Sequence, residues 1–300
     1  MAARSLTVAE ARAAGVSWKQ LQSSRWSKVG PGRYAIARTA TDIATILDSV
    51  QRRLPGCVFS GLTAAWLHGL DVPPCDPVEV ILPHHLGVSA RKGVLVHRME
   101  IGDGEITSRR GFPATTALRT VIDLARRPPL VEAVVLADMA LHAELVRLPE
   151  LQRYVDAHVG AKGIVAMRRV LSLAEPKSES PMESRLRLVI VSRGLLRPEA
   201  QTEIRDANGR LLGRIDLYYP QARLGIEYDG DHHHDRLADD DRRQNDLHLG
   251  DVRLLRYTKS DVYGDPDRIE MQVRFALGDW APKRRAAARK MGDWAPKRRV

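Results

Sequence analysis

The stretch that decides the fold of the C-terminal third reads Gly213-Arg-Ile-Asp-Leu-Tyr-Tyr-Pro-Gln-Ala-Arg-Leu-Gly-Ile-Glu-Tyr-Asp229. Residues 213–219 and 224–229 are each rich in β-branched, aromatic and aliphatic side chains, as strands are. Between them lies Pro220-Gln-Ala-Arg223, a loop of the length that connects two antiparallel strands. The pattern therefore predicts a β-hairpin.

The loop length also predicts which side chains meet across this hairpin. If Tyr219 faces Leu224, then Asp216 faces Glu227. Strand alternation places the apolar side chains on one face, namely Ile215, Leu217, Tyr219, Leu224, Ile226 and Tyr228. The other face carries Asp216, Glu227 and Asp229. Three carboxylates in one patch repel one another unless a cation neutralises them, so we expect a Mg²⁺ or Mn²⁺ site; the alternative is a solvated acidic face.

The residues that flank the hairpin suggest partners for such a site. Residues 182–193 form an apolar-faced helix that begins near Glu183. His233 follows the second strand closely, where a histidine can transfer a proton to or from the reacting groups. Arg243, on a helix expected after residue 240, and Arg256, on a closing strand, are candidates to hold a phosphate or to pair with the acids.

The order of helix, hairpin, helix and strand resembles the restriction-endonuclease-like core. More narrowly, it is similar to a family of unknown function related to very-short-patch repair endonucleases. The likeness is carried by Glu183, Arg187, Ile215-Asp216, Glu227-Tyr-Asp-Gly-Asp-His-His233, Asp240-x-x-Arg243-x-x-x-Leu247 and Gly250 through Arg256-Tyr-Thr258. It implies that Asp216 and Glu227 bind metal and that Glu183 is the helix glutamate. One departure is that Glu227-Tyr228-Asp229 has no lysine where the Glu-x-Lys motif has one.

The N-terminus has a different pattern. Thr7-Val-Ala-Glu10 and Ser17-Trp-Lys-Gln20 are two capping boxes on either side of Gly15, which predicts two short helices joined by a tight turn. Strand-like residues on both sides of Gly30-Pro-Gly32 then predict a wing. A winged helix would present to a duplex its second helix and wing, with Lys19, Gln22, Arg25, Lys28 and Arg33. The alternative is a packing domain whose charges are solvated.

The winged start and the segment after it, roughly the first half of the chain, resemble the AbiEi-type antitoxin-like regions of bacterial abortive-infection systems. Two stretches carry this likeness, Phe59-Ser-Gly-Leu-Thr-Ala-Ala-Trp-Leu-His-Gly69 and Gly111-Phe-Pro-Ala-Thr-Thr-Ala-Leu-Arg-Thr-Val-Ile-Asp-Leu-Ala125. The resemblance implies a DNA-binding N-terminus and a partner toxin, and it names no reaction.

The end of the chain is strongly basic. The net charge is +10, and most of it lies beyond residue 280, where Gly278-Asp-Trp-Ala-Pro-Lys-Arg-Arg285 recurs as Gly292-Asp-Trp-Ala-Pro-Lys-Arg-Arg299. Such a tail could neutralise phosphates through Lys283, Arg284, Arg285, Lys297, Arg298 and Arg299. A recent duplication that produced a solvated tail explains the repeat equally well.

These observations together predict an α+β multidomain protein. The expected parts are a winged helix-turn-helix at 1–40, an AbiEi-like mixed α/β middle domain at 41–175, an endonuclease-like α/β core at 178–275 and a basic tail at 276–300. Two cysteines, no membrane-length apolar run and no export signal favour a cytoplasmic protein. The expected function is Mg²⁺- or Mn²⁺-dependent DNA endonuclease activity; the alternative is a non-catalytic DNA-binding regulator or antitoxin-like protein with a degenerate nuclease fold.

Overall fold

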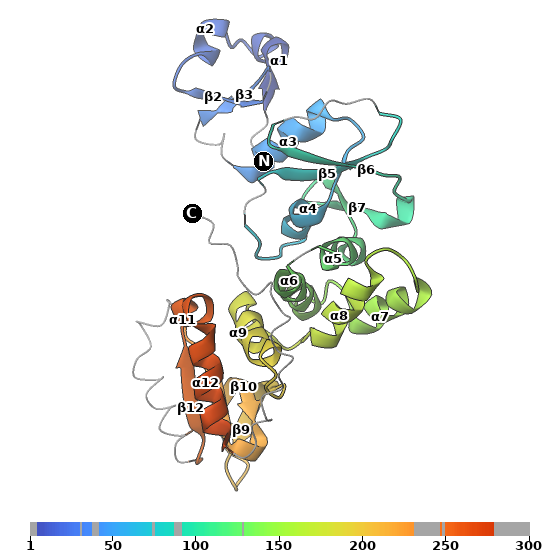
Figure 1. Ribbon diagram of the computed structural model, residues 1–300. Helices are drawn as coiled ribbons and strands as arrows, with labels where there is room; N and C mark the ends of the chain where they lie inside the picture. The colour runs from blue at the N-terminus through green and yellow to red at the C-terminus, as the bar shows by residue number, and fades with distance from the viewer. Residues whose placement is uncertain are drawn as a thin grey trace. The chain divides into compact units, whose positions relative to one another are not determined.

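The protein was analysed as a computed structural model that describes residues 5–30, 32–37, 42–73, 76–86, 92–127, 129–230, 247 and 250–278. The fold is mixed α+β, with three separate sheets (Figure 1). The chain forms two compact units, residues 1–123 and 124–300, so the predicted boundary after residue 175 does not separate compact units. Within the described residues, no helix has the length and apolar character needed to cross a membrane.

The first unit begins with a small three-stranded domain. Its elements are β1 (Leu6–Thr7), α1 (Val8–Ala13), α2 (Trp18–Leu21), β2 (Trp26–Gly30) and β3 (Arg33–Ile36), with strand order β1-β3-β2. Both predicted capping boxes form: the Thr7 and Ser17 hydroxyls accept from the backbone amides of Glu10 and Gln20, and the Thr7 and Ser17 backbone amides donate to the Glu10 and Gln20 side chains. Local sequence therefore sets both helix starts. The β2–β3 hairpin, at the place of the predicted wing, comes next in the chain.

A five-stranded mixed sheet follows in the same unit, in the order β6-β5-β4-β8-β7. Its elements are α3 (Ile43–Arg53), β4 (Val58–Phe59), α4 (Gly61–Leu67), β5 (Val78–Leu82), β6 (Val94–Arg98), β7 (Ile106–Arg109), β8 (Phe112–Thr115) and α5 (Ala117–Ala125). The core of this sheet contains Leu47, Phe59 and Val80, all fully buried.

The start of α4 depends on a glycine. The Gly61 backbone has φ +54°, and a Cβ placed there would lie 2.3 Å from the Glu79 carboxylate. That carboxylate accepts a hydrogen bond of 3.0 Å from the Leu62 amide, one of the helix donors that have no intrahelical partner. Glu79 therefore takes the place of a side-chain cap that the preceding serine does not supply.

The second unit begins with a group of helices, α6 (Leu130–His142), α7 (Leu148–Ala157), α8 (Ile164–Leu173) and α9 (Pro181–Ser192). Helices α6 and α9 pack together around an ion pair in which Arg187 Nη2 lies 2.7 Å from Asp138 Oδ2. The side chains are 0% and 1% exposed. The Arg187 guanidinium also donates to the Leu173 carbonyl, and Asp138 accepts from the Glu175 amide. This packing explains why α6 to α8 belong to the same unit as α9.

A four-stranded sheet completes the unit, with order β12-β11-β10-β9. Its elements are β9 (Glu199–Arg205), β10 (Leu211–Tyr219), the 3-10 turn η3 (Pro220–Ala222), β11 (Leu224–Tyr228) and β12 (Arg253–Tyr257), followed by α11 (Lys259–Gly264) and α12 (Pro266–Leu277). Strands β11 and β12 are parallel. Helices α9 and α12 pack together over one face (Figure 1).

The hairpin register is confirmed, because Tyr219 pairs with Leu224 and Leu217 with Ile226. One detail differs from strict alternation. Leu217 and Tyr219 pack against α9 and α12, whereas Ile215 lies in a second core together with Tyr218. The alternation is interrupted beside Asp216, where Gln201 of the neighbouring strand has a left-handed φ of +50°.

The buried ion pair generates a prediction about stability. Replacing Asp138 with alanine should lower the free energy of unfolding by about 3–5 kcal/mol, because it leaves a buried guanidinium without its counter-charge. The control Glu132→Ala removes the carboxylate that pairs with Arg185 between the same two helices, where the side chains are 39% and 15% exposed. It should cost at most about 1 kcal/mol. Urea unfolding measures both, and equal losses would contradict the role given to the buried pair.

Candidate functional site

The acidic site is built where α9, β9 and β10 meet. Helix α9 begins after Ser180, whose hydroxyl accepts from the Glu183 amide, and this first turn carries the Glu183 side chain. Gln201 Nε2 lies 2.8 Å from Glu183 Oε2 and 3.2 Å from Asp216 Oδ1. One amide group therefore donates to two carboxylates from different elements, which holds these carboxylates near each other.

Asp216 is also bound to the neighbouring strand. Its Oδ2 accepts a hydrogen bond of 2.9 Å from the Tyr228 backbone amide. This bond forms beyond the last ladder pair of the hairpin, Leu217 with Ile226. The side chain of Asp216 thus satisfies a backbone donor at the point where the two strands stop pairing.

Glu227 has a different partner. In the parallel ladder it lies in register with Arg256, and Arg256 Nε is 3.3 Å from Glu227 Oε2. The Glu227 side chain is 8% exposed and that of Arg256 is 34% exposed. The parallel register therefore places Glu227 beside Arg256, on the two strands that follow the one carrying Asp216 in the sheet order.

The site perturbs the titration of one of its acids. Burial, and to a smaller extent the neighbouring charge of Asp216, raise the pKa of the Glu183 carboxyl above its usual value, although three hydrogen bonds act in the opposite direction. Because of its burial and the nearby Asp216 charge, the Glu183 carboxyl keeps its proton to a higher pH than an exposed glutamate does.

The structure brings together only part of the predicted site. Glu183 lies beside Asp216, as expected, but in the described residues no three His, Cys, Asp or Glu side chains gather closely enough to hold one metal ion. The predicted cluster of Asp216, Glu227 and Asp229 is therefore not found, because Glu227 turns to Arg256 and Asp229 is exposed. His233 and Arg243 lie outside the described residues.

Two further residues behave differently from the expectation. Arg187, which carried part of the endonuclease resemblance, is buried against Asp138. Gln201 was missed by the sequence interpretation, since a lone glutamine in a strand has no distinguishing pattern. Only the pairing of β9 with β10, which puts Gln201 opposite Asp216, would have identified it.

The winged-helix surface is the second candidate site. Lys19, Gln22, Arg25 and Lys28 are exposed, and neither lysine nor Arg25 has a carboxylate partner in the part of the chain that the structure describes. The prediction for Arg33 is wrong, because this residue is buried and donates to the Ser5 hydroxyl and carbonyl at 3.1 and 2.8 Å. An ion pair of 3.6 Å to Glu10 adds to this anchoring. Arg33 thus fixes β3 to the N-terminal segment.

The basic tail cannot be placed, because residues 279–300 lie outside the described part. The tail residues concerned are Lys283, Arg284, Arg285, Lys297, Arg298 and Arg299. Their role in nucleic-acid binding stays a prediction.

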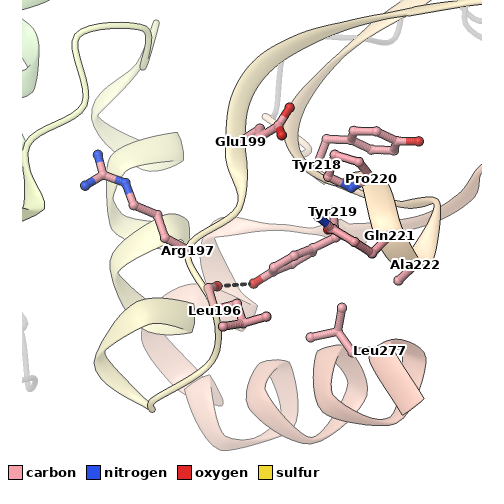
Figure 2. A pocket seen from close by; sticks show the side chains of 9 residues that line it. All are labelled: Leu196, Arg197, Glu199, Tyr218, Tyr219, Pro220, Gln221, Ala222 and Leu277. Carbon is pink, nitrogen blue, oxygen red and sulfur yellow. Dashed lines mark hydrogen bonds between the residues drawn. The ribbon is translucent and has the colours of Figure 1, made fainter. Parts of the chain in front are cut away.

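A cavity of about 370 Å³ lies elsewhere in the second unit (Figure 2). Its lining is largely aromatic and aliphatic, and Tyr219 at its centre donates a hydrogen bond of 2.6 Å to the Leu196 carbonyl. None of Glu183, Asp216 and Glu227 lines it. The cavity is therefore separate from the acidic site.

Comparison with known proteins agrees with part of the sequence interpretation. Residues 56–173 match the AbiEi antitoxin C-terminal domain. Two uncharacterized proteins of Mycobacterium tuberculosis, from strains CDC 1551 / Oshkosh and ATCC 25618 / H37Rv, are each 30% identical over 217 residues, which is 70% of this chain and 78% of the relative. The chain belongs to the family of these mycobacterial proteins.

One solved structure is also similar, the crystal structure of the RV2827C protein from Mycobacterium tuberculosis. It aligns with a TM-score of 0.41 and 16% identity over 60% of this chain and 74% of that chain.

The AbiEi match spans the division between the two compact units, since it continues through α8 in the second unit.

The raised pKa of Glu183 generates a prediction about pH. A carboxyl whose pKa is higher in the folded state stabilises the fold fully below its unfolded pKa, and this contribution is lost as pH rises through the folded pKa. Glu183→Gln should therefore flatten the fall in unfolding free energy as the pH rises above the ordinary glutamate pKa of about 4.3. Urea titrations over this range measure it. The matched control is Glu203→Gln, an exposed β9 carboxylate, and a pH profile that Glu183→Gln leaves unchanged would contradict the prediction.

Proposed function

We propose that this protein is a cytoplasmic DNA-binding regulator of the antitoxin type. The observation that carries the proposal is the exposed set of Lys19 on α2, Lys28 on β2 and Arg25 between them, none with a carboxylate partner among the described residues, in a chain that also matches the AbiEi antitoxin C-terminal domain. Cations without carboxylate partners are available to DNA phosphates, and their binding releases counterions. The same match supports a partner toxin.

Substitution of these three cations tests the DNA-binding part of the proposal. Replacing Lys19, Arg25 and Lys28 together with glutamine should weaken duplex binding and reduce the log–log salt slope by up to about 0.9 for each phosphate that is no longer neutralised. Fluorescence anisotropy with a labelled duplex at several salt concentrations measures both changes. The effect should be electrostatic and should not depend strongly on sequence at positions that contact only phosphate.

A matched control separates this surface from net charge alone. The triple variant Arg147→Gln, Arg153→Gln and Arg205→Gln removes the same charge from exposed positions in the second unit. Wild-type affinity in this control supports the winged-helix interface. An equal loss in the two triple variants would contradict it and would show that binding follows the total charge.

A second candidate function is metal-dependent endonuclease activity, the one that the resemblance of residues 178–275 implies. It is favoured by a specific observation: Asp216 and Glu227 each lie one residue beyond the last ladder pair of the hairpin, and Glu183 is joined to Asp216 through Gln201. Carboxylate oxygens are ligands that Mg²⁺ and Mn²⁺ prefer, and Mg²⁺ commonly takes only one or two of them together with substrate phosphates.

Asp216 and Glu227 would hold the ion, so the donor set fits although three acids do not converge. A bound ion would polarise the phosphoryl oxygen and acidify a water molecule. In this proposal His233 transfers a proton and Arg243 stabilises charge in the transition state.

The Asp216→Ala variant tests the second candidate. It should abolish nicking of plasmid DNA in Mg²⁺ or Mn²⁺ while leaving duplex binding close to that of the wild type, because the cations proposed to bind DNA lie in the first unit. The measurement compares wild type and variant with metal and with EDTA. Absence of metal-dependent cleavage by the wild type on duplex, single-stranded and mismatched DNA would eliminate this candidate and leave the regulator.

A further inference from the structure

We infer that Arg256 is a phosphodiester-binding residue of the acidic site and supplies the positive charge that the missing lysine would give. The inference rests on the second candidate function only in taking the acidic site to receive nucleic acid. It assigns a substrate contact to a strand that the Glu-x-Lys pattern does not include.

The first support is the way in which Glu227 holds the arginine. Strands β11 and β12 run parallel with Glu227 and Arg256 in register, and Nε of the arginine lies 3.3 Å from Oε2 of the glutamate. The carboxylate is almost fully buried, whereas a third of the Arg256 side chain is exposed. A buried counter-charge thus lies beside Nε of the guanidinium, and the arginine side chain keeps part of its surface in solvent.

The second support is the small number of contacts that the Arg256 side chain makes with the rest of the described fold. Beyond Glu227, the Arg256 side chain has no hydrogen-bond or ion-pair partner among the described residues. Arg253, three residues earlier on the same strand, instead donates its Nη2 to the carbonyls of Ala222 and Ala276 at 3.1 and 2.8 Å. Arg253 is thus bound to its own fold, whereas the terminal nitrogens of Arg256 make no such contact within the described part of the chain.

The third support is chemical. A guanidinium anchored through Nε presents two terminal nitrogens, and this edge matches two oxygens of one phosphate group. In the Glu-x-Lys pattern the positive charge follows the glutamate by two residues, and this chain has Asp229 there. The parallel neighbour strand places a cation beside the same glutamate. Without it, the carboxylates of Asp216 and Glu227 would repel a phosphate.

The experiment uses the full-length protein and the dinucleotide thymidylyl-thymidine, whose single phosphodiester is too small to need the winged helix. Arg256→Gln should weaken its binding about tenfold, as expected when a charge-assisted hydrogen bond is removed, and Arg256→Lys should restore part of it. Isothermal titration in MgCl₂ and in EDTA gives the dissociation constants. The matched control is Arg205→Gln, which removes an exposed arginine from β9 of the same sheet and should bind as the wild type does.

A second variant separates binding from folding. Arg256→Gln removes the positive charge beside the buried Glu227 carboxylate, so the double variant Glu227→Gln/Arg256→Gln provides a neutral pair whose thermal unfolding should lie near that of the wild type. Loss of dinucleotide binding in this folded double variant supports the inference. Wild-type binding in Arg256→Gln or in the double variant would overturn it, as would a wild-type protein that does not bind the dinucleotide.

The outcomes also distinguish this inference from the endonuclease proposal. If Arg256→Gln loses dinucleotide binding and no form of the protein cleaves DNA, Arg256 is a phosphate contact in a non-catalytic site. If the wild type cleaves DNA and Arg256→Gln cleaves it with an unchanged KM and kcat, the endonuclease proposal holds and the role of Arg256 is refuted.

Discussion

A fully buried guanidinium and carboxylate, Arg187 and Asp138, form the contact on which the second unit depends. Neither charge reaches water, so each needs the other and the backbone groups of Leu173 and Glu175 to offset the cost of burial. The pair fixes α9 against α6. Glu183 lies one turn before Arg187 on the same helix, so the contact that holds the helix also sets the position of the first acid of the site.

The features that could be predicted from the sequence are those set by interactions between residues close together in the chain. A four-residue loop and two strand patterns were enough to place Tyr219 opposite Leu224, and the threonine and serine caps fixed two helix starts. Long-range partners were not accessible in this way. Arg33 reads as a surface cation in a wing, and only the fold shows that Ser5 and Glu10 enclose it.

The partners of the carboxylates in the acidic site were also inaccessible from the sequence, because neighbouring strands supply them. Alternation assumes that every residue turns to the opposite face, yet the left-handed backbone of Gln201 interrupts the pattern beside Asp216. The result is that an amide joins Asp216 to Glu183, while Glu227 is left to Arg256 on the other neighbouring strand. A glutamine in an unusual conformation and a parallel strand from later in the chain therefore shape the site as much as the carboxylates do.

The extent of the AbiEi match and the division of the fold do not coincide. Helices α6 to α8 are shared by a recognised family segment and by the unit that contains the four-stranded sheet. A fragment ending at residue 175 would carry Asp138 without the arginine that neutralises it. The two segments therefore do not behave as independent modules: a change on either side of the α6–α9 interface has to keep the buried charges of Asp138 and Arg187 matched.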